Sequence, residues 1–82
     1  MSLILFHFET GEPDCPYWTI MVIAKGNFDA DILDDILDEI QEDNPGMEFE
    51  DVVENAMNQL KCEWESVDGV IPACTGWYEF WK

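Results

Sequence analysis

Two apolar runs in the first third of the chain predict β-strands. Residues 2–9 read SLILFHFE and residues 17–24 read YWTIMVIA. Both runs are rich in branched aliphatic and aromatic residues, which favour extended backbone. Residues 10–16 between them hold a glycine, two prolines and an aspartate, a composition typical of a loop. We therefore expect two strands, each covered on one face and partly covered on the other.

The apolar period becomes helical in the middle of the chain. One stripe predicts a helix over residues 29–43, and a second stripe predicts a helix over residues 48–60. The stripes are Ile32, Leu33, Ile36, Leu37 and Ile40, followed by Phe49, Val52, Val53, Ala56, Met57 and Leu60. Asn27 or Asp29 is suited to cap the first helix, and the Asn-Pro-Gly sequence at residues 44–46 ends it.

Alternation of apolar and polar residues returns after residue 61 and predicts a third strand over residues 62–67. A final strand is expected over residues 77–81, because Asp68-Gly69, Pro72 and Gly76 interrupt the segment between the two. The order ββααββ favours an α+β fold, in which an antiparallel sheet is packed on one face by a helical pair. We expect residues 1–82 to form this single domain.

The balance of charges narrows the choice of partners. The chain has 19 Asp and Glu against three Lys and no Arg, which gives a formal net charge of −16. Self-repulsion at this level destabilises a compact fold. Nucleic acids and the anionic membrane leaflet repel such a surface, so we expect neither to be bound directly. The charge favours basic proteins, metal cations or polycations as partners, and of these we expect a basic, nucleic-acid-binding protein.

The first predicted helix concentrates this charge opposite its apolar stripe. Carboxylates four positions apart on a helix are neighbours, each such pair costs about 0.2–0.5 kcal/mol, and no lysine lies within the helix to relieve it. Such a row offers a DNA-binding groove a field similar to that of phosphates. A solvated helix face is the alternative. The candidate partner-binding residues are Asp31, Asp34, Asp35, Asp38, Glu39, Glu42 and Asp43, flanked by Asp51 and Glu54 of the second helix.

In size, charge and acidic row the chain resembles the small, Arg-poor DNA-mimic proteins of phages and plasmids. The resemblance covers the composition of the whole chain and the row Asp31, Asp34, Asp35, Asp38 and Glu42. Proteins of this class block restriction enzymes, CRISPR effectors, repair glycosylases or nucleoid proteins, and they share no common fold. The resemblance implies an anti-defence inhibitor or a regulator of a nucleic-acid-binding protein, such as a host defence nuclease complex.

Other functions stay open beside this one. A sheet face with some of Tyr17, Met21, Trp64 and Trp81 would form an apolar patch for an adaptor contact or a homodimer. A zinc site would need Cys15, Cys62, Cys74 and His7, but no two cysteines have the short spacing of zinc motifs. Buried free thiols are the commoner role. We therefore expect neither a metal nor another cofactor.

Catalysis has little support in the sequence. His7 is the only histidine, and it lies inside an apolar strand, where a packed or half-exposed role is expected. No glycine-rich phosphate loop is present. The odd number of cysteines, the first seven residues without the pattern of a signal peptide, and the lack of an apolar run of about 20 residues favour the cytoplasm.

Overall fold

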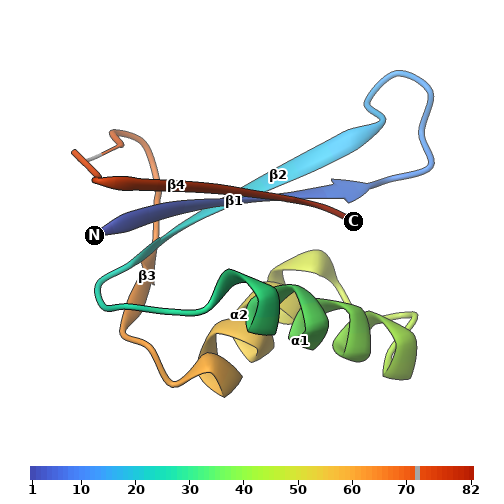
Figure 1. The fold of residues 1–82 in the computed structure, drawn as a ribbon. Coiled ribbons are helices and arrows are strands. Elements are labelled where there is room, and N and C mark those ends of the chain that lie inside the picture. The colour runs from blue at the N-terminus through green and yellow to red at the C-terminus, as the bar shows by residue number, and fades with distance from the viewer. Residues whose placement is uncertain (72) are drawn as a thin grey trace.

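The computed structural model describes residues 1–71 and 73–82 as one sheet and two helices (Figure 1). The elements are β1 (Ser2–Glu9), β2 (Tyr17–Ala24), α1 (Ala30–Asp43), α2 (Phe49–Leu60), β3 (Trp64–Ser66) and β4 (Gly76–Trp81). The α+β class and the order ββααββ are therefore confirmed. Pro72, which was predicted to interrupt the last segment, lies outside the described residues.

The sheet is mixed and has the strand order β3-β2-β1-β4. β1 pairs antiparallel with β2, and β2 pairs antiparallel with β3, but β1 and β4 run parallel. An entirely antiparallel sheet was expected, and this detail was wrong. The reason is that β3 and β4 follow each other in the chain without being neighbours in the sheet. The chain crosses from one edge of the sheet to the other between them, which sets the direction of β4.

Both helices cover the same face of the sheet, and the main core lies between the two layers (Figure 1). From the sheet side, Ile4, Phe6 and Phe8 of β1 are fully buried in this core. Phe6 stacks on Phe8 and Phe80, with ring centroids 6.4 and 5.7 Å apart. Because burying one such side chain contributes about 1.5–3 kcal/mol, this aromatic row carries much of the stability of a chain this small.

A smaller cluster covers part of the opposite face of the sheet, which no helix covers. Leu3, Leu5 and Ile23 are buried there under Val67 and Cys74 of the segment that joins β3 to β4. This connection is held at its two ends by hydrogen bonds, because the Val67 amide donates to the Met21 carbonyl and the Thr75 amide to the Met1 carbonyl. Because this connection covers Leu3 and Leu5 while the helices cover the other face, β1 is apolar on both faces.

Local contacts account for the ends of α1. Asp29 is the N-cap, and its Oδ1 accepts from the backbone amide of Asp31 at 2.9 Å. Of the two predicted caps, Asn27 is therefore not used. Leu33 and Leu37 are buried, but Ile32 is 52% exposed, so its predicted place in the buried stripe was wrong. Ile32 lies about 100° around the helix from Leu33, which turns it away from the sheet.

Gly76 is fixed by the close approach of β4 to β1. A Cβ atom at this position would lie 2.6 Å from Ser2 Oγ, well inside van der Waals contact. Gly76 and Ser2 are also register partners in the parallel pair. The residue that the sequence marks as an interruption is therefore the first residue of β4.

We predict that Leu37→Ala lowers the free energy of unfolding by about 2–5 kcal/mol, because it leaves a cavity under α1. Ile32→Ala, on the same helix, is the matched control and should change stability by no more than about 0.5 kcal/mol. Urea unfolding followed by circular dichroism measures both. Equal losses in the two variants would show that the helix does not pack on the sheet through Leu37.

Candidate functional site

The predicted acidic row lies along the outer side of α1. The helix turns Leu33, Leu37 and Ile40 toward the core, so its opposite side faces solvent. Asp34 is half-buried, and the other predicted residues of α1 are exposed. The exposed set consists of Asp31, Asp35, Asp38, Glu39, Glu42 and Asp43. We name these six residues together with Asp34 the acidic arc.

Lys82 neutralises one side of the acidic arc. Its ammonium forms an ion pair with Asp34 and lies 2.7 Å from Asp38 Oδ1, and only 11% of its side chain is exposed. The Lys82 backbone amide donates to the His7 carbonyl at 2.8 Å, which extends the pairing of β4 with β1 beyond the strand. The helix contains no cation of its own, as the sequence shows, but the fold brings one to it from 44 residues away.

The ion pairs change the titration of Lys82. Burial lowers the pKa of its ammonium, but the hydrogen bonds and negative charges of Asp34 and Asp38 raise the pKa more, so that it lies above its ordinary value. A group with a raised pKa in the folded state adds stability below its unfolded pKa and loses that contribution as pH rises through the folded pKa. The contact therefore stabilises the fold at neutral pH.

Glu54 and Glu65 lie away from the acidic arc. Asp51 and Glu54 of α2, the predicted flanking residues, are both exposed. Glu54, however, lines a hollow of about 250 Å³ with Trp64 and Ser66 of β3, at the opposite edge of the sheet from β4. Glu65 lies on the face without helices, with its carboxylate 3.4 Å from Lys25 Nζ. The continuous row of carboxylates is therefore formed by the residues of α1.

His7 is packed, which confirms one of its two predicted roles. Its Nδ1 lies 2.8 Å from Thr19 Oγ1, and its Nε2 lies 3.2 Å from Glu79 Oε1. The ring also stacks on the Trp81 indole, with centroids 4.0 Å apart. Both ring nitrogens are therefore engaged by neighbours on the sheet, and the histidine orients the side chains around it.

The face of the sheet without helices carries exposed aromatic residues. Tyr17 and Trp81 lie there as considered from the sequence, and so does the half-buried Met21. Trp64 does not, because it packs against the main core and donates from Nε1 to Asn58 Oδ1 at 3.2 Å. Cys62 and Trp64 alternate with Glu63 and Glu65 along the chain, and this pattern indicates that the two apolar residues face the core. Trp77, which the sequence analysis did not single out for this face, is 62% exposed.

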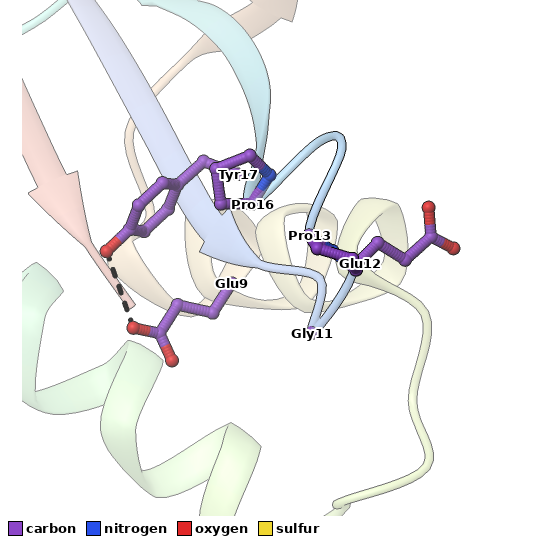
Figure 2. Close-up of a pocket in the computed structure, with 6 residues that line it drawn as sticks. All are labelled: Glu9, Gly11, Glu12, Pro13, Pro16 and Tyr17. Carbon is purple, nitrogen blue, oxygen red and sulfur yellow. Dashed lines mark hydrogen bonds between the residues drawn. The ribbon is translucent and has the colours of Figure 1, made fainter.

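Two open hollows lie at the loop between β1 and β2. One, of about 280 Å³, has Tyr17, Pro16, Gly11 and Glu9 in its lining, and Figure 2 shows Tyr17 donating a hydrogen bond to Glu9 at its edge. The other, of about 510 Å³, has Trp18, Met47 and Phe49 as its apolar floor. Glu12 lines both, and their carboxylate rims suit a cationic group and repel an anionic one.

The four residues considered for zinc lie apart. Cys15 is exposed in the loop between β1 and β2, Cys62 packs against the main core, and Cys74 packs in the smaller cluster on the other face of the sheet. Within residues 1–71 and 73–82, no group of three His, Cys, Asp or Glu side chains is arranged to hold a metal ion. In the same ranges, no helix has the length and apolar character needed to cross a membrane.

We predict that Lys82→Met lowers the free energy of unfolding by about 1–3 kcal/mol at pH 7, because it leaves Asp34 and Asp38 unneutralised. Lys25→Met removes the same charge from an exposed pair and should cost less than about 1 kcal/mol. Denaturant unfolding at several pH values measures both. The deficit of Lys82→Met should be constant below the unfolded pKa of lysine and shrink as pH rises through the raised Lys82 pKa, and a deficit that persists undiminished above that pH would contradict the ion-pair account.

The chain was also compared with known proteins. No protein-family model matches it, and no curated protein or solved structure does so either.

Proposed function

We propose that this protein is a non-enzymatic inhibitor or regulator that binds a basic, nucleic-acid-binding protein through the acidic arc. The observation that carries the proposal is the uninterrupted row of exposed carboxylates along α1, with Lys82 at one side of the row. The partner belongs to the class that DNA-mimic proteins block, such as a defence nuclease complex. It would recognise the arc in place of a phosphate backbone.

The dimensions of the arc suit this role. From Asp31 to Glu42 the helix rises about 16 Å, at roughly 1.5 Å per residue. A stretch of duplex DNA of that length presents several phosphates on one strand, at about 3.4 Å each. The carboxylates are spaced more widely, but they are held on a rigid helix whose other side is buried. A fixed row of this kind attracts a basic groove without an ordering cost for its backbone.

Lys82 divides the arc into two parts. Asp34 and Asp38 contribute to the fold through their ion pairs, whereas Asp31, Asp35 and Glu39 have no ion pair among the described residues. Neighbouring like charges on a helix cost stability, and this cost is left unrelieved over most of α1. Binding to a cationic surface would relieve it, since each carboxylate would gain an opposite charge. Asp31, Asp35 and Glu39 are therefore the proposed centre of the contact.

The proposal is tested by replacing this centre with amides in the triple variant Asp31→Asn, Asp35→Asn and Glu39→Gln. Its control is the triple variant Glu12→Gln, Glu63→Gln and Asp68→Asn, which removes the same charge at exposed positions outside α1. Tagged proteins are used to capture partners from a nuclease-treated bacterial lysate. The capture should give a basic protein that elutes with salt and is displaced by duplex DNA. The α1 variant should bind that protein at least about tenfold more weakly, at roughly 0.5 kcal/mol for each lost charge pair.

Two results would overturn the proposal. In the first, the α1 variant and its control bind the captured protein equally well, which would make the charge of α1 a solvated surface. In the second, the captured partner resists salt and is not displaced by DNA, which would place the contact on another surface.

A further inference from the structure

We infer that the face of the sheet without helices holds a second binding site, which takes an arginine side chain of a basic protein between Trp81, Tyr17, Glu79 and Glu9. This site does not depend on the acidic arc, because the two lie on opposite faces of the sheet. We name these four residues the aromatic–acidic cluster.

Strand register brings the cluster together from three strands. His7 of β1 is the register partner of Trp81 in β4 and of Thr19 in β2. Glu9, two residues further along β1, is the partner of Tyr17. Side chains two positions apart on a strand share a face, at about 6.6 Å. Glu79 and Trp81, also two positions apart on β4, are therefore neighbours on the same surface.

The aromatic pair leaves ring surface open to solvent. Trp81 is 59% exposed although one face of its indole lies on the His7 ring. Tyr17 meets Trp81 edge-on, at a centroid distance of 5.1 Å and an interplanar angle of 88°. Such a corner presents an electron-rich aromatic face that attracts a cation within about 6 Å. His7, hydrogen-bonded on both nitrogens, holds the indole in place.

Among the described residues, the two carboxylates at the site have one side-chain partner each, His7 for Glu79 and Tyr17 for Glu9. Glu79 contacts the His7 ring, and Glu9 accepts from the Tyr17 hydroxyl at 3.4 Å. No lysine of the described chain pairs with either carboxylate. Lys82 is turned to α1, and Lys25 lies about 26 Å along β2 from Tyr17. Each carboxylate thus retains acceptor capacity for an incoming cation.

The chemistry favours arginine of another protein as the occupant. A guanidinium group is planar, stacks on an aromatic ring and donates a fork of N–H groups to a carboxylate, whereas a lysine ammonium does only part of this. A second copy of the chain is a poor occupant, because it contains no arginine and carries a net charge of −16. A basic protein complements both the rings and the charge of this face.

The first experiment titrates the full chain with N-acetyl-arginine amide, and N-acetyl-citrulline amide serves as the uncharged control of nearly the same shape. The chain has four tryptophans, so its indole N–H groups give a small set of NMR cross-peaks. We expect the Trp81 cross-peak to shift in a saturable manner with the arginine probe and to stay unchanged with citrulline. Equal shifts at all four indoles, or the same response to citrulline, would overturn the inference.

The second experiment compares Trp81→Leu with Trp77→Leu, since both tryptophans are exposed on this face and Trp77 lies outside the cluster. The loss of a cation–π contact at an exposed site should weaken binding of an arginine-rich peptide about two- to fivefold, and only for Trp81→Leu. Glu79→Gln keeps the acceptor for His7 and should also weaken binding. Equal peptide binding by all three variants would overturn the inference. A dimer of the chain in analytical ultracentrifugation that dissociates in Trp81→Leu would also overturn it, because a second copy would then occupy this face.

Discussion

The pairing of β1 with both of its neighbours is the interaction on which the rest of the structure depends. β1 is hydrogen-bonded to β2 on one edge and to β4 on the other, and its side chains are buried on both faces. The phenylalanines on one face form the floor of the helix layer, and the leucines on the other lie under the β3–β4 connection. Both candidate binding surfaces depend on β1. The pairing of β4 with β1 positions Trp81 on one face of the sheet and Lys82 beside α1 on the other.

Much of the fold is predictable from the local pattern of the sequence. The strands at residues 2–9 and 17–24 match β1 and β2, and the two apolar stripes match α1 and α2. These elements are predictable because each has a strong period of its own. The direction of β4 is not predictable, because no local pattern indicates which strand it pairs with. The same holds for Trp77, whose side of the sheet depends on the register of that pairing.

The candidate site shows a similar division. The residues of the acidic arc share one side of α1 because a single helix positions them, and the sequence is sufficient to place them there. The ion pairs of Lys82 are not predictable from the sequence, since they join residues 44 or more positions apart. The cluster around Trp81 draws residues from three strands in register, so a sequence pattern cannot assemble it. The row of carboxylates on α1 can therefore be predicted from the sequence, whereas the contacts of Lys82 and of Trp81 require the strand pairing of the sheet.

The parallel pairing of the first and last strands also bears on how the chain folds. Gly76 and Ser2 are separated by 74 positions, so this contact closes a loop that contains nearly the whole chain. Contacts of such high order cost loop entropy before they return any stability, and they slow folding. Until β4 docks, the ammonium group of Lys82 is also absent from α1, and the helix carries its full mutual repulsion. The docking of the last strand thus adds a sheet edge and a counter-charge together, and the electrostatic part of that gain weakens as ionic strength rises.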